Sequence, residues 1–306
     1  MHKDLYYESR GTGMIRACRW EPKQAPRGIV QIIHGIADYS ERYDDFAEYL
    51  TNMGFLVVSE DHMGHGLSAK EGDLRGYFTG GWFAAVDDTY GLFELTKNEY
   101  PDLPYILFGH SMGSFMLQTI LQRYPQIDVT ACILCGSGWQ PEIALNSGIR
   151  LCNAACRIYG ETNPSPRLLK IVFGAYNLKV EYPRTPYDWV CRSSRVVDDL
   201  IADPLCSHSI STGLMRDMLQ GIASIQQPAN IEKINKSMPY LLVSGGDDPV
   251  GSYGEGVRKI EEKLLLAGIR NVKTRIYPLC RHEVLNELNK ADVYTDIVKW
   301  IISVIT

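Results

Sequence analysis

The sequence contains no run of about 18 uninterrupted apolar residues, so it predicts no membrane-spanning helix. Its first residues, MHKDLYYESRGTG, hold no apolar stretch of the kind that a secretory signal needs, so no signal peptide is expected. An excess of basic residues is also missing. The net charge of -5 argues against a nucleic-acid partner, because proteins usually bind nucleic acid through basic patches.

The cysteines show no pattern typical of a disulfide framework or a zinc site, although the chain of 306 residues contains eight of them. Cys132 and Cys135 form a C-x-x-C, but they lie inside the apolar run TACILC. We interpret both as small core residues of a strand rather than as a redox pair. This cysteine usage favours a reducing, cytoplasmic location.

Six short apolar runs indicate buried parallel strands, which are typically short and lack alternation. Hydrophobic residues make up 45% of the chain and charged residues 22%, so a sizeable core can form. A β-hairpin is expected at the start, where DLYYES and MIRACRW flank a Gly-Thr-Gly turn. The six runs are residues 28–34, 55–60, 105–109, 131–136, 240–245 and 272–278.

Helical stripes lie between these runs. Phe46, Leu50 and Met53 recur at helical spacing, and the chain ends on a stripe through Ile297 and Ile301. Alternating strands and helices predict an α/β fold with a mostly parallel central sheet flanked by helices.

One segment breaks this alternation, because no parallel-strand candidate occurs between Gly136 and Tyr240. We interpret residues 138–210 as a helical cap inserted into the sheet domain. The core would then consist of residues 1–137 and 211–306. A stripe through Leu145 and Ile149 leaves two interpretations open: the helix packs on the core, or its apolar face lines an acyl tunnel or touches lipid aggregates.

Ser111 is the candidate nucleophile. The pattern Gly109-His-Ser-Met-Gly113 follows the strand YILF and leads into a helical stripe. A nucleophilic serine must project from a sharp strand-to-helix turn, which crowds its flanks and so requires glycine. The N–H of Met112, at the start of the helix, can then face a developing negative charge.

A serine hydroxyl needs a base, and His282 is the histidine in the expected place. It follows the last predicted strand, and Asp248 follows the strand before it. Both lie where ligands bind in open α/β sheets, in the chain order serine, acid, histidine. We prefer Asp248 to Asp247 because Pro249 favours an extended backbone at Asp248.

Two histidine-rich segments have other interpretations. The loop at His34 and Gly35 is expected to supply a second N–H to the oxyanion hole, with His34 shaping that loop. The segment Asp61-His62-Met-Gly-His65 has the residue types of a metal site. No fourth ligand is evident, so we favour a loop-shaping role and predict no metal.

Together these segments resemble the monoglyceride lipase and lysophospholipase group, also described as serine aminopeptidase-like hydrolases. HGIADYSERY resembles that group's H-G-x-x-E-H-S-x-R-Y loop, and DHMGHGLS matches D-x-x-G-H-G-x-S. GHSMGS, GGDDPV and RHEVLNE match its nucleophile, acid and histidine loops, and DDLIADPLC is similar to a stretch in its cap. Asp38 and Tyr39 depart from the group, which usually has Glu and His there.

The resemblance implies an α/β-hydrolase fold and a triad of Ser111, Asp248 and His282, with oxyanion N–H groups at Ile36 and Met112. It implies a serine carboxylester hydrolase that cleaves single-chain acyl esters, such as monoacylglycerols, lysophospholipids or medium-chain esters, without a cofactor. Contact with lipid aggregates or a membrane surface is expected to be transient at most. The alternatives are a small-substrate serine aminopeptidase or amidase, and a non-catalytic binding protein on the same fold.

Overall fold

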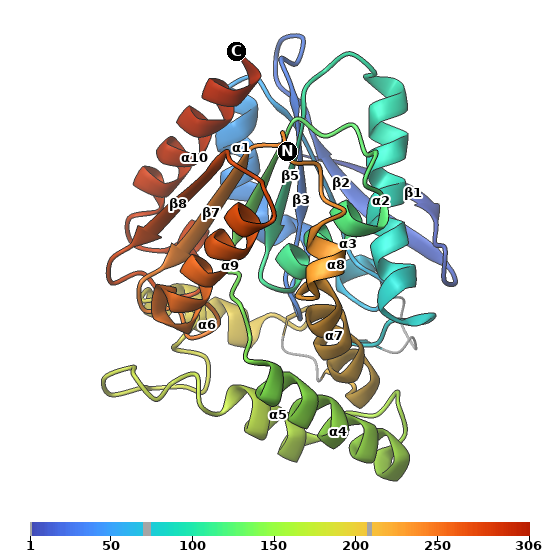
Figure 1. Cartoon of the computed structure of the whole chain (residues 1–306), viewed down its shortest axis with the longest axis vertical. Coiled ribbons are helices and arrows are strands. Elements are labelled where there is room, and N and C mark those ends of the chain that lie inside the picture. The colour runs from blue at the N-terminus through green and yellow to red at the C-terminus, as the bar shows by residue number, and fades with distance from the viewer. Residues whose placement is uncertain (1, 70–74, 207–209) are drawn as a thin grey trace.

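A computed structural model describes residues 2–69, 75–206 and 210–306 of the chain. Its centre is an eight-stranded sheet in the order β1-β2-β4-β3-β5-β6-β7-β8 (Figure 1). The strands are β1 (Lys3–Glu8), β2 (Met14–Trp20), β3 (Ile29–Ile33), β4 (Leu56–Glu60), β5 (Tyr105–His110), β6 (Ala131–Cys135), β7 (Tyr240–Gly245) and β8 (Val272–Tyr277).

The six predicted parallel strands are all present as β3 to β8, paired in parallel across the sheet. Strands β3 to β7 are buried along their whole length, which explains why their sequences are apolar without alternation. The predicted hairpin forms β1 and β2, and β2 joins the sheet antiparallel to β4.

Helices cover both faces of the sheet (Figure 1). One core lies under α2, α3, α7 and α9, and the other lies under α1 and α10. The helices are α1 (Asp44–Asn52), α2 (Gly81–Glu99), α3 (Met112–Arg123), α4 (Glu142–Tyr159), α5 (Pro166–Phe173), α6 (Ser194–Ala202), α7 (Thr212–Ile225), α8 (Pro228–Ile231), α9 (Glu255–Leu266) and α10 (Lys290–Ile305).

The described chain between β6 and β7 forms helices α4 to α8 with loops between them, and α4 and α5 lie beyond the end of the sheet (Figure 1). Helix α4 packs chiefly against α7, which in turn contacts α3 and α2 of the sheet domain. The cap boundaries at residues 138 and 210 stay a prediction. None of the helices in the described part of the chain is long and apolar enough to cross a membrane.

Candidate active site

Ser111 occupies a strained turn between β5 and α3. Its φ of 51° and ψ of -120° lie outside the regions that a non-glycine residue normally adopts. A Cβ on Gly113 would lie 2.0 Å from the carbonyl oxygen of Ile33, and one on Gly109 would lie 2.6 Å from that of Gly113. Both flanking positions therefore require glycine, as the sequence pattern indicated.

Asp248 and His282 are brought together from the ends of β7 and β8. The Nδ1 atom of His282 lies 3.0 Å from Oδ1 of Asp248. Asp248 is fully buried and also accepts a hydrogen bond from the N–H of Val250 at 2.9 Å. Its neighbour Asp247 is exposed. Of the two adjacent acids, Asp248 is therefore buried beside His282 and Asp247 faces solvent.

The imidazole of His282 reaches over the end of β6 to the turn that holds Ser111. Its ring centre lies 5.0 Å from that of His110, the residue before Ser111. A Cβ on Gly136, directly after β6, would lie 3.0 Å from Cε1 of His282. Glycine at this position therefore leaves the space that the imidazole occupies.

Burial and charge act in opposite directions on His282. Burial alone lowers its pKa, but the charge and hydrogen bond of Asp248, with contributions from Glu283 and Asp38, raise the pKa above its ordinary value. Burial and the nearby His282 lower the pKa of His110 to about 4. His282 can therefore accept a proton near neutral pH while His110 stays uncharged.

The loop after β3 lies against the Ser111 turn, since a Cβ on Gly35 would lie 3.3 Å from Cβ of Ser111. Ile36 is in this loop, and Met112 is the first residue of α3. Among the loop and turn bonds of the described residues, the N–H of Ile36 has no acceptor, and the N–H of Met112 is one of the first in α3, which have no acceptor within the helix. Both groups are therefore free to bind an oxygen.

Asp38, which stands where the monoglyceride lipase group usually has Glu, accepts several hydrogen bonds within this loop. Its carboxylate accepts hydrogen bonds from the hydroxyl of Tyr43 at 2.7 Å, from Arg42 at 3.0 Å and from the N–H of Tyr39 at 2.9 Å. Tyr39, the other departure, donates its hydroxyl to Asp203 of the cap at 2.7 Å. Both departures therefore serve to hold the loop.

Arg42 and Glu283 form a bidentate pair that the sequence analysis missed. The two N–O distances are 2.9 and 2.8 Å. Burial raises the pKa of Glu283, but Arg42 outweighs that effect and lowers the pKa to about 2. Arg42 lies in the HGIADYSERY loop and Glu283 in RHEVLNE, but the sequence does not show that the two side chains meet.

Two residues before α6, Trp189 and Val190, contact the His282 loop directly. The N–H of Glu283 donates to the carbonyl of Val190 at 2.8 Å, and the N–H of His282 donates to that of Trp189 at 3.4 Å. The indole ring of Trp189 lies 5.1 Å from the imidazole of His282, centre to centre. The cap therefore shields and supports the candidate base.

Leu145 and Ile149 lie on α4, the helix that packs against α7. Leu145 is buried and Ile149 is half-buried. Leu145 also lines a cavity of about 450 Å³ with Trp139, Ile231 and Leu266. Ser111 is not among the residues that line this cavity, so the tunnel stays a prediction.

The histidine segment after β4 shapes the neighbouring loop. Asp61 accepts hydrogen bonds from the N–H of Ser40 at 2.9 Å and of Leu67 at 2.8 Å. His62 faces Glu60 at 3.0 Å, and Nδ1 of His65 lies 3.1 Å from the carbonyl of Met63. These contacts agree with the loop-shaping interpretation.

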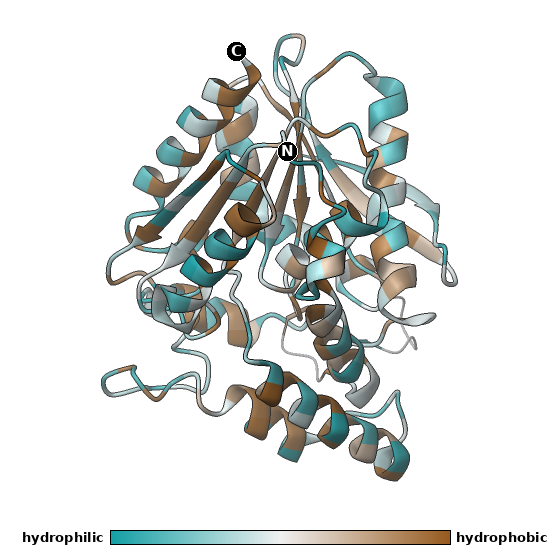
Figure 2. Ribbon diagram, viewed as in Figure 1, coloured by the Kyte–Doolittle hydropathy of each residue, from teal (hydrophilic) through white to brown (hydrophobic). Residues whose placement is uncertain are grey.

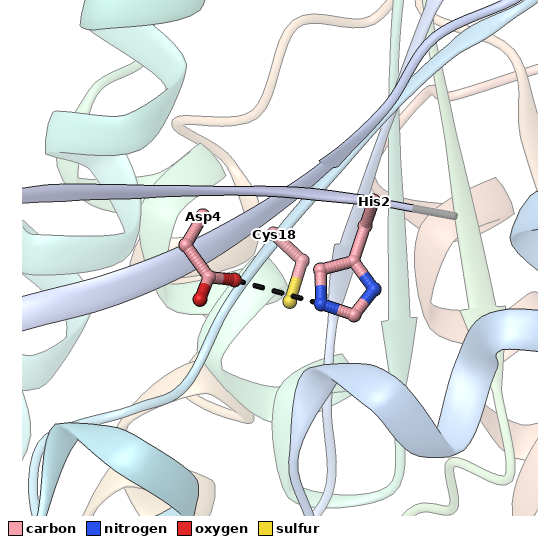
Figure 3. A group of neighbouring side chains, drawn as sticks. All are labelled: His2, Asp4 and Cys18. Atoms are coloured by element: carbon pink, nitrogen blue, oxygen red, sulfur yellow. Dashed lines mark ion pairs between the residues drawn. The ribbon is translucent and has the colours of Figure 1, made fainter.

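Elsewhere in the described chain, His2, Asp4 and Cys18 bring three potential metal ligands together (Figure 3). The guanidinium of Arg16 already donates to Asp4 at 2.6 Å and lies 3.1 Å from Nε2 of His2. A cation would have to displace this charge, so the residues fit an ion-pair network better than a metal centre.

Comparison with known proteins shows the family of this chain. Residues 24–289 match the family described as serine aminopeptidase, S33. The chain belongs to this family. It is 29% identical over 298 residues to a monoacylglycerol lipase of Mycolicibacterium smegmatis, covering 96% of this chain and 95% of that protein. It is 25% identical to the monoglyceride lipase of Mus musculus, covering 94% of this chain and 90% of that one.

Among solved structures, a thermostable carboxyl esterase from Bacillus coagulans superimposes with a TM-score of 0.92 at 29% identity, covering 100% of this chain and 99% of that one. These similarities confirm the predicted α/β-hydrolase fold and the predicted group. They also confirm that the S33 family member is an enzyme of the serine hydrolase class.

Proposed function

We propose that this S33 family member hydrolyses esters of single acyl chains through an acyl-enzyme on Ser111. One observation carries the proposal: the strained Ser111 turn lies beside the buried His282, whose Nδ1 is bonded to Asp248 at 3.0 Å. In this arrangement Asp248 fixes the proton on Nδ1 and leaves Nε2 of His282 as the base.

The reaction has two steps. His282 takes the proton of Ser111 while Oγ attacks the ester carbonyl, and the N–H groups of Ile36 and Met112 bind the resulting oxyanion. His282 then protonates the leaving alcohol, and an ester bond now joins the acyl group to Ser111. Water, deprotonated by His282, attacks this ester and releases the acid, which restores the serine. No step needs a cofactor.

The substrate class rests on the relatives. Two are named monoacylglycerol or monoglyceride lipase, and a similar structure is named a carboxyl esterase. We therefore favour monoacylglycerols, lysophospholipids or medium-chain esters over the aminoacyl amides that an aminopeptidase cleaves. The eight free cysteines fit a reducing compartment, and we place the protein in the cytoplasm.

The outer face of α4 favours brief contact with aggregated lipid. Ile143 and Ile158 recur on one side of the helix and are 82% and 72% exposed. Ile171 of α5 is 62% exposed, and Figure 2 shows hydrophobic residues along both helices. Arg150 and Arg157 are also exposed on α4. Apolar side chains flanked by basic ones are typical of helices that rest on a lipid surface.

Turnover of a substrate panel tests the proposal. The panel comprises p-nitrophenyl esters, monoacylglycerols, lysophospholipids and aminoacyl amides, and Ser111→Ala is the control. Esters should be cleaved fastest, and the variant should lose both turnover and labelling by a fluorophosphonate. Faster cleavage of the amides would support the aminopeptidase alternative. Undiminished labelling of Ser111→Ala would remove Ser111 as the nucleophile, and no turnover of any substrate would favour a binding protein.

A further inference from the structure

The peptide group between Gly35 and Ile36 is held by the side chain just before it. The Nδ1 atom of His34 lies 2.7 Å from the carbonyl oxygen of Gly35. The peptide contains both this oxygen and the N–H of Ile36, and the described peptide bonds are trans. In a planar trans peptide the C=O and N–H point in opposite directions. Holding the Gly35 oxygen therefore also fixes the direction of the Ile36 N–H.

The hydrogen bonds of His34 leave one possible protonation state. The backbone N–H of His62 donates to Nε2 of His34 at 2.9 Å. A backbone N–H can only donate and a carbonyl can only accept. Nε2 must therefore carry the lone pair, and Nδ1 must carry the proton that it donates to Gly35. His34 is fully buried, and burial, followed by the nearby His62 and His65, lowers its pKa well below the ordinary value.

His62 also contacts the backbone of His34, and its ring lies against the His34 ring. Nε2 of His62 lies 3.1 Å from the carbonyl oxygen of His34, and Nδ1 of His62 lies 3.0 Å from the carboxylate of Glu60. The rings of His34 and His62 lie 3.8 Å apart, centre to centre. The residues from Glu60 to the Gly35 carbonyl thus form one buried chain of polar contacts between β4 and the loop beside Ser111.

We propose that His34 is a positioning residue that sets the oxyanion hole by orienting the Gly35–Ile36 peptide. This inference rests on the proposed function, in which the N–H of Ile36 binds the oxyanion. Without the bond from His34, the peptide can rotate and turn the Gly35 carbonyl towards the Ser111 side. An acceptor would then replace a donor at the point where negative charge develops.

Two substitutions separate this role from simple packing. The amide nitrogen of asparagine lies near the position of Nδ1, so His34→Asn can still donate to the Gly35 carbonyl. Glutamine reaches the position of Nε2, so His34→Gln can accept from the N–H of His62 but loses the donor to Gly35. Asparagine leaves the larger void, so packing alone predicts a lower melting temperature and lower activity for His34→Asn.

The measurements are kcat and KM on a soluble p-nitrophenyl ester, the inhibition constant of a trifluoromethyl ketone, and the melting temperature. Removing one oxyanion donor costs about 10²–10³ in kcat. We expect a loss of about 10²-fold for His34→Gln with KM nearly unchanged, and a loss within about tenfold for His34→Asn. The ketone, which forms an oxyanion on the serine, should weaken in parallel with kcat.

Equal losses in the two variants, or an order of activity that follows the melting temperatures, would overturn the proposal. If either variant does not fold, ¹⁵N NMR of histidine-labelled wild-type protein gives the answer. The Nδ1–H form of His34 is expected, and an Nε2–H form or an imidazolium would overturn the inference. Ser111→Ala is measured first: if it keeps turnover, the proposed function fails, whereas an inactive Ser111→Ala leaves the His34 comparison decisive.

Discussion

The guanidinium of Arg281 donates a hydrogen bond of 2.6 Å to the carbonyl oxygen of Asp188. The same Nη1 atom donates to the carbonyl of Cys191 at 3.0 Å. Arg281 immediately precedes His282, and His282 and Glu283 also donate to Trp189 and Val190, so the loop of the candidate base is bonded to residues 188–191 from several positions. Residues 188–191 therefore help to hold His282 in place, although they lie in the segment between β6 and β7.

Removing this contact should disturb the placement of His282 more than substrate binding. We expect Arg281→Ala to lower kcat by up to about 10²-fold, because a misplacement of about 1 Å can cost that much. KM should change little, and Arg281→Lys should recover part of the loss. Arg195→Ala, which removes an exposed arginine of α6 paired with Asp199, is the matched control. Steady-state kinetics on a soluble ester provide the test, and an unaltered kcat in Arg281→Ala would argue against coupling.

Substitutions of the two adjacent acids should differ strongly in their effect on kcat. Asp248→Asn removes the buried carboxylate bonded to His282 and should lower kcat by about 10⁴, as for the acid of a serine protease triad. Asp247 is exposed, so Asp247→Asn should stay within about tenfold of the wild type, or ~1.4 kcal/mol of barrier. Kinetic constants for both variants on one ester give the ranking, and the reverse order would move the acid to Asp247.

The acid limb of the pH profile should report His282. Its raised pKa means that the base is protonated, and inactive, up to a higher pH than for an ordinary histidine. We therefore expect kcat/KM to rise with pH, with an inflection above about 6.5. His110, with a pKa of about 4, is already neutral in this range. In Asp248→Asn the inflection should move to lower pH, because the main group that raises the pKa is gone. An inflection below 6 in the wild type would contradict this assignment.

The pair of Arg42 and Glu283 should make stability depend on pH in acid. The pKa of Glu283 is about 2 in the folded protein and about 4.3 for an unperturbed glutamate. A lowered pKa stabilises the folded state above the unfolded pKa, and this stability is lost as pH falls from about 4.3 to about 2. The free energy of unfolding, measured with urea at several pH values, should therefore depend less steeply on pH in Glu283→Gln than in the wild type. Glu262→Gln replaces an exposed residue paired with Lys259 and should change this pH dependence much less. If the free energy of unfolding depends on pH equally in the wild type and in Glu283→Gln, the pair does not contribute to stability in acid.

The outer face of α4 should matter only for aggregated substrates. Ile143→Asp and Ile158→Asp replace exposed side chains, so folding and turnover of a soluble short-chain ester should be unaffected. Turnover of micellar monoacylglycerol should fall about tenfold for each, because immersing an isoleucine contributes roughly 1.5–3 kcal/mol. Leu145→Asp is the contrasting variant: it buries a charge against α7 and should lower the melting temperature. Equal losses on soluble and micellar esters would exclude a surface role.

The parallel strands were predictable because burial on both faces leaves a continuous apolar run that needs no knowledge of partners. β5 and β7 are the clearest examples, since every residue in them is buried. The residues at their carboxyl ends were predictable for the same reason, because parallel strands end at one edge of the sheet. Ser111 and Asp248 could be placed from this rule and from the spacing of glycines.

Pairings across long stretches of chain were not predictable. Arg42 and Glu283 are separated by 241 residues, and no local pattern links a surface-type arginine to a glutamate that distant. Helix α4 shows another limit. The predicted stripe includes Leu145, which is buried, but Ile143 and Ile158 on the opposite side are also apolar. A helix that is apolar on two sides has no single periodicity from which its buried face can be read.

The eight cysteines are all free thiols, and Cys156 is the single one that is not buried. It lies on α4, between the exposed arginine at position 157 and the buried alanine at position 155. A maleimide fluorophore should therefore react first with the cap, without any engineered attachment point. The wild-type sequence thus offers its own attachment point for a dye, whose emission would follow the surroundings of α4 when substrate or lipid is added.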